Sequence, residues 1–274
     1  MRNFDLDDLA VIQAVVVHGG ITRAAQTLHR VPSNVTTRIK QLEARIGVAL
    51  FTRRGRGLMP TEQGRLLAGY ADRLLRLAHE AESALQAGQP LGALRLGALE
   101  STAGSRLPPL LARYNHKHPA IRIELVTGTT AALIGRLARH DIEAAFVSEP
   151  FHAPGLTARP VFDEELVLIT APHARSPRDA VGATGATLIA FANGCSYRQR
   201  LEQWQRELGA GTAGVLEFSS YPAIVACVAA GAGVAIVPRS VLAGLRAARS
   251  VRAHPLPAHL AHSRTHLLWH GDQE

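Results

Sequence analysis

Cationic and hydroxyl side chains gather in the first sixty residues, and their types suit contact with a polyanion. Eight arginine and lysine residues lie between Ile21 and Gly57, opposed by a single acid, Glu43. Guanidinium and ammonium groups bind phosphates, and hydroxyl and amide groups also bond base edges. The segment is therefore a candidate DNA-binding region, with these predicted contact residues: Ser33, Thr36, Thr37, Arg38, Lys40, Arg53, Arg54 and Arg56.

A second set of polar side chains falls where strands are expected to end and helices to begin. In an open α/β domain, such positions meet at one edge of the sheet, where helix N-termini direct N–H groups at a ligand. The alternative for each residue is a plain helix cap. Taken together they are candidate effector-binding residues for a small polar ligand: Ser101, Thr102, Thr129, Thr130, Ser148, Cys195 and Ser196.

Other chemistry finds little support in the sequence. The letters Gly209-x-Gly211-x-x-Gly214 match a dinucleotide pattern, but they follow an expected helix and precede a strand, the reverse of what phosphate binding needs. The C-terminal histidines have no metal-site spacing. Cys195 falls at an expected helix N-terminus, which would lower its thiol pKa and leaves a redox role open; a buried or cleft-lining residue is the alternative. We expect no cofactor, no metal and no enzymatic activity.

The basic segment must be positioned by helices, and a run of charge alone is equally typical of a solvated face. Apolar residues at helical spacing predict a first helix over 5–18, which Gly19-Gly20 ends. Thr22 is expected to cap a short second helix over 23–29. A third helix should begin near Pro32. A short helix, a tight turn and a helix with hydroxyl and basic groups suit the major groove.

The third helix is expected to turn Val35, Ile39, Leu42 and Ile46 inward. After it, residues 49–51 and 57–59 can pair as a hairpin around 52–56, which places three arginines at a tip. Such a wing suits phosphates or a minor groove. Without the wing, the segment would be an ordinary three-helix bundle.

A long amphipathic helix is expected from Thr61 to about Ala87, with Gly88-Gln89-Pro90 marking its end. Its apolar residues step by three and four and predict a coiled-coil seam. An amphipathic helix of this length needs a partner surface, either its own domain or a second copy. The seam residues are Leu67, Tyr70, Leu74, Leu77, Ala81 and Ala84.

From Gly92 onward, strand and helix patterns alternate, which predicts an α/β domain large enough for two lobes. The uncharged stretch 218–237 is long enough to cross a bilayer. Glycines and prolines interrupt it, so a helix over 222–230 and a buried strand over 234–237 explain it better.

The N-terminal motifs resemble those of LysR-type transcriptional regulators. The likeness rests on the run "ITRAAQTLHRVPSNVTTRIKQLEARIGVALFTRRGRGLMPTEQGRLLA", with its alanine pair, its L-E helix, its G-V-x-L-F wing and the T-x-x-G start of its next helix. It departs from the family at Met59-Pro60-Thr61 and at Asn34. The phrases "LRLGALESTAGSRLPPLLARYNHKHPAIRIELVTGTT" and "ACVAAGAGVAIVPRSV" are similar, more loosely, to the effector domain of that family.

The resemblance implies an N-terminal all-α winged helix-turn-helix (residues 1–60), a linker and dimerisation helix (61–89), and a C-terminal α/β two-lobed, periplasmic-binding-protein-like effector domain (90–274). Lobe one would comprise about 91–161 plus 266–274, and lobe two about 162–265. Relatives commonly continue into a further helix where this sequence ends, which would leave part of lobe one less covered.

The expected function is a LysR-type regulator that binds an interrupted inverted repeat in double-stranded DNA as a homodimer or homotetramer. A small polar, anionic metabolite between the lobes would alter DNA bending or contact with RNA polymerase. The net charge of +8 and the pI of about 10.4 agree with a polyanionic partner. The acidic start, MRNFDLDDLA, does not resemble a signal peptide, so we expect a cytoplasmic protein without a membrane partner. A constitutive repressor with a non-functional cleft and a DNA-tethered enzyme are the alternatives.

Overall fold

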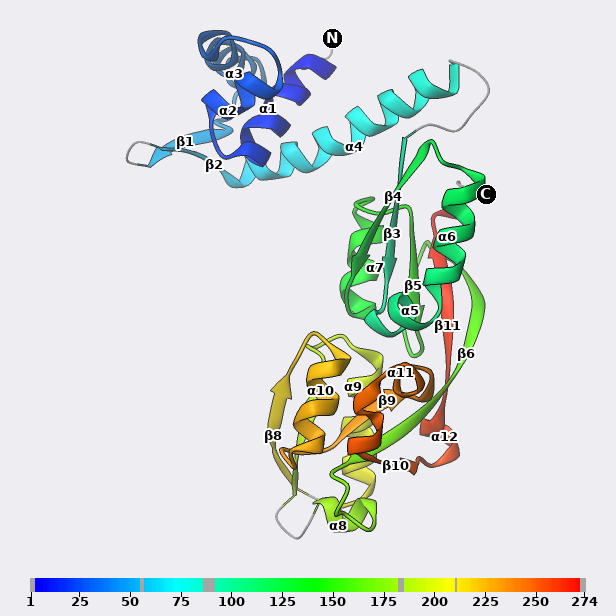
Figure 1. Cartoon of the computed structure of the whole chain (residues 1–274). Coiled ribbons are helices and arrows are strands. Elements are labelled where there is room, and N and C mark those ends of the chain that lie inside the picture. The colour runs from blue at the N-terminus through cyan, green and yellow to red at the C-terminus, as the bar shows by residue number, and fades with distance from the viewer. Residues whose placement is uncertain (1–2, 55–56, 86–91, 182–184, 210, 272–274) are drawn as a thin grey trace. The chain divides into compact units, whose positions relative to one another are not determined.

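A computed structural model describes residues 3–54, 57–85, 92–181, 185–209 and 211–271. The chain folds as two compact units, Met1–Gly92 and Ala93–Glu274. The first unit forms the following elements in chain order (Figure 1): α1 (Leu6–His18), α2 (Ile21–Thr27), α3 (Pro32–Ile46), β1 (Phe51–Arg54), β2 (Gly57–Pro60) and α4 (Glu62–Leu85).

The core of the first unit forms where α1, α2 and α3 meet. Ala24 and Ala25 are buried, and their small side chains let α2 lie close to its neighbours. The helix bounds follow from local signals: Asp5 caps α1, and Gly19 and Gly47 end α1 and α3 in the left-handed conformation that glycine adopts without strain. The predicted inward positions of α3 are confirmed for Val35, Ile39 and Leu42, with Ile46 packed at the margin.

Two local predictions in this unit are wrong. The N-cap of α2 is Gly20, with no side-chain cap, so Thr22 lies within the helix instead of capping it. The hairpin pairs Phe51 with Pro60 and Arg54 with Gly57, so Arg53 and Arg54 lie on β1 and not in the connecting turn. Residues 55 and 56, and with them Arg56, lie outside the described residues.

The second unit alternates strands and helices as the sequence pattern indicates, and it adds short elements that the pattern did not predict: α5, α8, α11, η1, β10 and α12. Its elements are β3 (Gly92–Ala98), α5 (Glu100–Ser105), α6 (Leu107–Lys117), β4 (Ile121–Thr127), α7 (Thr130–Ala138), β5 (Ala144–Ser148), β6 (Thr157–Thr170), α8 (Pro177–Val181), β7 (Ala186–Ala190), α9 (Ser196–Glu207), β8 (Thr212–Glu217), α10 (Tyr221–Ala229), β9 (Ala235–Pro238), α11 (Arg239–Gly244), η1 (Arg246–Ser250), β10 (Arg252–Pro255), α12 (Ala258–Ala261) and β11 (His262–Trp269).

One curled sheet joins both lobes of this unit. Its strand order is β10-β6-β11-β5-β3-β4, and β9 also pairs with β6. The first part of β6 pairs with β11, whereas its last residues pair with β9 and β10. Figure 1 shows β6 and β11 running side by side from one lobe to the other. The two crossing strands of the expected two-lobed fold are therefore β6 and β11.

Each lobe has its own apolar core. Leu133, Leu137 and Val147 belong to a cluster between α7 and the β3–β5 side of the sheet, in lobe one. In lobe two, separate clusters surround Leu188 and Val225. The residue bounds given above for the segments and lobes stay a prediction.

The apolar stretch 218–237 folds as the sequence indicates. Ser220 caps α10 by accepting a hydrogen bond from the Ala223 N–H, and β9 follows after a turn at Gly231. No helix among the described residues is both long enough and apolar enough to cross a bilayer.

Candidate DNA interface and ligand site

The exposed face of α3 carries several of the predicted DNA contacts. Ser33, Thr37 and Lys40 are exposed. The Thr36 hydroxyl donates to the Pro32 carbonyl at 2.9 Å, so this side chain is half-buried against its own helix. Hydroxyl and ammonium groups on one exposed helix face can bond phosphates and base edges.

Arg38 does not share that free face. Its Nε donates to Asp8 at 2.7 Å, and its Nη2 donates to both carboxylate oxygens of Asp5. The hydrogen bonds and charges of these two acids outweigh its desolvation and raise the pKa of Arg38. This geometry does not favour Arg38 as a DNA contact, because its donors already have acceptors at the start of α1.

The hairpin is anchored to α3 and α4 by side chains that the sequence did not single out. Glu43 accepts hydrogen bonds from the Leu50 and Phe51 N–H groups at 2.7 and 3.0 Å. The Thr61 hydroxyl donates to the Leu50 carbonyl and accepts from the Gly64 N–H. A Cβ at Gly64 would meet the Leu50 oxygen at 2.0 Å, so glycine is required there. These bonds fix where β1 leaves the body of the domain.

One face of α4 is apolar and exposed. Its inner face packs on the unit through Ala68 and Ala71, and Leu67 also packs against this core. Leu67, a residue of the predicted seam, is thus half-buried on its own domain, and the seam itself stays a prediction. The exposed stripe, which we call the α4 stripe, consists of Leu66, Tyr70, Leu74 and Leu77.

In the second unit, the structure brings three of the predicted ligand residues together. Thr130 Oγ1 lies 3.3 Å from the Ser148 carbonyl oxygen and 3.3 Å from Ser196 Oγ. The Ser148 hydroxyl in turn lies 2.7 Å from Ser263 Oγ. Thr130, Ser148 and Ser196 are all buried. This hydroxyl cluster joins α7 and β5 of lobe one to α9 of lobe two.

The remaining predicted ligand residues lie apart from these bonds. Ser101 and Thr102 are buried in α5. Thr129 is the N-cap of α7, and its side chain accepts from the Ala132 N–H at 3.4 Å. Cys195 occupies the N-cap of α9 without a side-chain cap bond.

The expected effect on Cys195 is wrong in sign. Burial raises the pKa of its thiol, and the nearby backbone N–H groups of Tyr197 and Arg198 offset this only in part. Desolvation outweighs the helix terminus because the side chain is buried in the lobe-two core. The geometry therefore gives no support to a reactive thiolate.

Polar atoms without partners lie in the same region. Ser101 Oγ, Tyr197 Oη and Thr265 Oγ1 are buried and have no partner with hydrogen-bond geometry in the described structure, although the Ser101 and Ser148 hydroxyls lie near the Tyr197 phenol. Burial raises the pKa of Tyr197 to about 12, despite the opposing effect of the neighbouring Ser148 and Ser101 hydroxyls. Its phenol is thus a neutral donor at neutral pH. Buried polar atoms that lack partners are costly, so a ligand that supplied them would gain binding energy.

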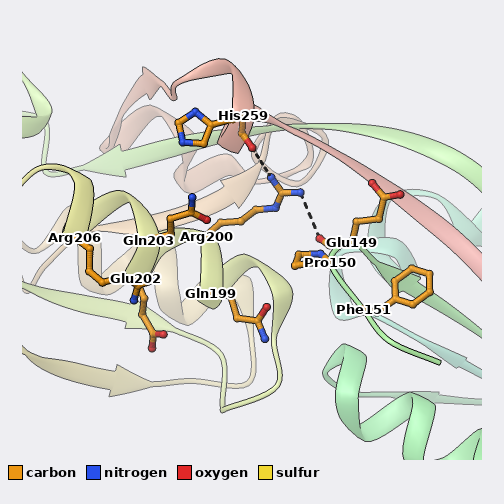
Figure 2. A pocket seen from close by; sticks show the side chains of 9 residues that line it. All are labelled: Glu149, Pro150, Phe151, Gln199, Arg200, Glu202, Gln203, Arg206 and His259. Atoms are coloured by element: carbon orange, nitrogen blue, oxygen red, sulfur yellow. Dashed lines mark hydrogen bonds between the residues drawn. The ribbon is translucent and has the colours of Figure 1, made fainter. Parts of the chain in front are cut away.

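A pocket of about 750 Å³ opens beside this region, between the loop after β5 and the helices α9 and α12 (Figure 2). None of the seven predicted ligand residues lines it. Its lining residues are Glu149, Pro150, Phe151, Gln199, Arg200, Glu202, Gln203, Arg206 and His259.

Arg200 crosses this pocket and touches both lobes. Its Nη1 donates to the His259 carbonyl at 3.3 Å and its Nη2 to the Glu149 carbonyl at 3.5 Å (Figure 2). Its Nε is buried without a partner, and burial lowers the pKa of its guanidinium. The Glu149 carboxylate turns to His266 at 2.8 Å instead. Burial would raise the pKa of Glu149, but the His266 bond and the charge of Arg264 bring it below its ordinary value.

Besides His266, three more of the C-terminal histidines have structural partners. His254 bonds Thr170, His259 bonds Glu207, and His270 bonds the Leu137 carbonyl. Among the residues that the structure describes, no group of three or more histidine, cysteine, aspartate or glutamate side chains is placed to hold a metal ion.

The residues that sequence reasoning missed share one property: their roles depend on groups that belong to other elements of the fold. Asp8 and Glu43 bind groups on other elements, and Tyr197 and Arg200 sit on an amphipathic helix that also supplies core residues. For Asp8 the sequence did offer a signal. It is an acidic residue, next to Leu9, on a helix face that is otherwise apolar, and such a residue needs a charged partner.

A winged helix-turn-helix followed by a two-lobed α/β domain is the architecture of a ligand-responsive DNA-binding regulator. Two family profiles agree: "Bacterial regulatory helix-turn-helix protein, lysR family" matches residues 6–65, and "LysR substrate binding domain" matches residues 87–274. The chain belongs to the LysR family of DNA-binding transcription regulators.

Named relatives cover nearly the whole chain. YusT of Bacillus subtilis (strain 168), described as an uncharacterized HTH-type transcriptional regulator, is 39% identical over 262 residues, 95% of this chain and 88% of its own length. The HTH-type transcriptional regulator GltR of the same strain is 36% identical, covering 90% of this chain and 84% of its own length. These relatives are named as regulators and not as enzymes.

Solved structures share the fold. Full-length CbnR in complex with its target DNA aligns with a TM-score of 0.71 at 23% identity, covering 99% of this chain and 95% of that one. A full-length OxyR variant from Pseudomonas aeruginosa also aligns with a TM-score of 0.71, at 21% identity, covering 98% of this chain and 90% of that one. At this identity the likeness concerns the fold alone.

Proposed function

We propose that this regulator reads an interrupted inverted repeat as a dimer and responds to a small anionic metabolite bound between the lobes of its effector domain. On this proposal it acts in the cytoplasm, where bacterial DNA is accessible. The observation that carries the ligand-binding part is the set of buried, partnerless hydroxyls beside the lobe-bridging cluster of Thr130, Ser148 and Ser196.

The DNA-reading part is supported by the exposed face of α3. Ser33, Thr37 and Lys40 would enter the major groove or bind its phosphates, with Thr36 at the margin. Arg53, Arg54 and Arg56 would supply positive charge from the wing. CbnR, which has the same fold, was solved in complex with its target DNA, and this supports a DNA-binding role for the proposed regulator.

The dimeric part is supported by the α4 stripe. Leu66 is 62% exposed and Leu77 is 61% exposed, which is unusual for leucines arranged along one helix face. A second copy of α4 would cover the stripe as a coiled-coil partner. A two-fold dimer presents two copies of α3 to related half-sites, which accounts for an inverted repeat. Assembly into a tetramer would use further surfaces.

The anionic character of the ligand is supported by the donors that face the lobe junction. Ser101 and Tyr197 offer neutral hydroxyl groups, and Arg200 offers a half-buried positive charge. A carboxylate can accept several such hydrogen bonds at once. Ligand binding would favour one arrangement of the lobes, and DNA bending or contact with RNA polymerase would change with it.

Selection of duplexes from a randomised pool by the full-length protein tests the DNA-reading part, followed by footprinting of the selected sequence. The proposal expects a site with two half-sites related by a dyad. A pool that stays random after selection would contradict it.

Thermal denaturation with a panel of small carboxylates, amines and sugars tests the ligand part. A carboxylate at 100 times its Kd should stabilise the protein by about 2.7 kcal/mol. Stabilisation by amines alone would contradict an anionic ligand. If no compound in a broad panel stabilises the protein, the constitutive repressor replaces the ligand-controlled one. Turnover of any panel member would instead indicate a DNA-tethered enzyme.

A further inference from the structure

The N-terminal end of α1 and the flank of α3 are joined by a charged network centred on Asp8. This carboxylate is 1% exposed and accepts from Arg38 Nε at 2.7 Å. Arg45 Nη2 donates to its other oxygen. A buried carboxylate is tolerated only when charges and hydrogen bonds compensate it, so Asp8 depends on both arginines.

A second acid completes the network from the N-cap of α1. Asp5 accepts Arg38 Nη2 at 2.7 and 2.8 Å, so Arg38 binds both acids with separate nitrogens. The same Asp5 caps the helix by accepting from the Asp8 N–H at 2.7 Å, and Asp8 accepts from the Asp5 N–H at 3.1 Å. The acceptors for Arg38 are therefore part of the helix cap itself.

The network restrains α3 at two places. Arg38 and Arg45 are seven residues apart, which is about two helical turns, and they lie on the same flank of α3. The core residues Val35, Ile39 and Leu42 give this helix an apolar contact that has little directional preference. The charged hydrogen bonds have defined directions, so a rotation or an axial shift of α3 on α1 would break them.

The exposed face of α3 lies opposite its core-facing residues. At about 100° per residue, Thr37 and Lys40 project away from Val35 and Ile39, while Arg38 lies between the two faces. A small rotation of α3 would move the exposed side chains relative to a DNA groove. Since contacts with base edges need correct placement, such a rotation would weaken sequence discrimination more than general attraction to phosphates.

We infer that Asp8 and Arg38 are positioning residues for DNA reading: they orient α3 through the network, and Arg38 does not itself contact DNA. The inference rests on the proposed reading of DNA by α3. It gives an acidic residue at the start of the chain a role in sequence specificity.

Two substitutions distinguish positioning from contact. In full-length protein, Asp8→Asn and Arg38→Gln would be compared by their affinity for a duplex selected by the wild-type protein and for a scrambled duplex of equal length. If the network positions α3, both variants reduce the affinity ratio between these duplexes by about tenfold or more. Affinity for the scrambled duplex stays equal or rises for Asp8→Asn, because that variant loses one negative charge.

The salt dependence of binding separates the two roles further. Each phosphate that an arginine neutralises contributes about 0.9 to the slope of log K against log salt concentration. A positioning role leaves this slope for the scrambled duplex unchanged in Arg38→Gln. A contact role lowers it by about 0.9 for each phosphate that Arg38 had neutralised, and Asp8→Asn would then tighten DNA binding by releasing Arg38. That pair of results would overturn the inference.

Asp7→Asn is the matched control. Asp7 is the neighbouring acid on the same turn, it is exposed, and it pairs with Arg30 at 2.7 Å. It approaches Arg38 only through an ion pair of 3.4 Å, which is longer than the bonds from Arg38 to Asp5 and Asp8. The charge change equals that of Asp8→Asn, so an equal loss of discrimination in this control would also overturn the inference. Arg38→Lys, which keeps the charge, should recover part of the ratio.

Far-UV circular dichroism and a cooperative melting transition show which variants are folded, and only folded variants enter the comparison. If Asp8→Asn fails to fold, Arg38→Gln and Arg38→Lys still test the inference. Equal affinity ratios between the selected and scrambled duplexes in these two variants and in wild type would overturn it. Failure of the proposed function would give a different result from failure of this inference, because the wild-type protein itself would then select no duplex.

Discussion

The hydroxyl oxygen of Thr130 in lobe one lies 3.3 Å from that of Ser196 in lobe two. Beside it, the Ala131 N–H donates to the Gly194 carbonyl at 3.2 Å. The first turns of α7 and α9 are therefore in direct contact. A ligand that enters between these helices has to displace this contact, whereas a ligand beside it can strengthen the closed arrangement of the lobes.

Thr130→Val tests the energetic weight of this contact. Valine keeps the shape but removes the hydroxyl, which leaves Ser148 and Ser196 without one partner each. Unpaired buried polar groups cost about 1–3 kcal/mol, so the Tm of the effector domain should fall by about 3–10 °C. Thr127→Val makes the same change at an exposed strand position and should shift the Tm by less than about 2 °C. Equal melting temperatures for both variants would show that the contact contributes nothing.

Gly194→Ala tests how closely the lobes approach. Gly194 has φ +87°, and a Cβ there would lie 2.7 Å from Ala131 Cβ. Gly155 has a similar φ, +77°, with nothing within 4 Å. Both alanine variants carry backbone strain of about 1 kcal/mol or more, but only Gly194→Ala also pushes against the other lobe. Calorimetry should therefore show the larger destabilisation for Gly194→Ala, and small-angle scattering should show a wider effector domain.

How much of the fold and of the candidate site can be predicted from the sequence depends on how far apart in the chain the contacting residues lie. Strand ends and helix starts are local signals, and they were enough to select Thr130, Ser148 and Ser196 as candidates. Arg38 was assigned to DNA because its acceptors lie 30 and 33 residues away, and charge counting along a segment does not reveal them. Leu67 of α4 was assigned to the predicted seam although it packs partly on its own domain, because periodicity alone does not say which apolar flank meets the domain.

Burial was the other quantity that the sequence did not provide. A helix N-terminus lowers a thiol pKa only when desolvation does not outweigh it, and Cys195 is buried in an apolar core. Likewise, the pocket at Arg200 depends on contacts between α9, α12 and the loop after β5. The carbonyls that Arg200 bonds there, at Glu149 and His259, lie 51 and 59 residues away in the chain.

Glu100→Gln should stabilise the protein at neutral pH. Burial raises the pKa of Glu100, and the hydrogen bond from the Tyr221 N–H offsets this only in part. Because the folded pKa is above the unfolded one, the ionised side chain opposes folding once the pH exceeds the folded value. Glutamine lacks this penalty and can still accept the N–H bond.

The advantage of Glu100→Gln should shrink as the pH falls through the folded pKa of Glu100, because the protonated wild-type side chain is also neutral. Melting curves of wild type and variant between about pH 3.5 and 8 measure this, since the range spans an ordinary glutamate titration and beyond. Asp163→Asn at an exposed strand position is the control. A constant difference across the range would contradict the assignment of the penalty to ionised Glu100.

Leu77→Asp should weaken self-association through the α4 stripe. A charge placed in a coiled-coil seam opposes its like copy across the dimer and removes an apolar side chain from the seam. Sedimentation at micromolar concentrations should show a shift toward monomer, with the Tm of the first unit little changed because Leu77 is exposed. His79→Asp lies about half a turn around the helix and should leave the association unchanged. A dimer of undiminished affinity in Leu77→Asp would place the interface elsewhere.

The double variant Arg53→Ala/Arg54→Ala tests the wing. Both residues lie on β1, whose hairpin is held in place by the bonds of Glu43 and Thr61. If their charges meet phosphates, the slope of log K against log salt concentration should fall by about 0.9 for each phosphate no longer neutralised, and affinity should drop for selected and scrambled duplexes alike. Arg122→Ala removes an exposed arginine from the second unit and should leave the slope as it is. An unchanged slope in the double variant would mean that β1 does not bind the DNA backbone through these residues, and the exposed face of α3 would then account for the salt dependence.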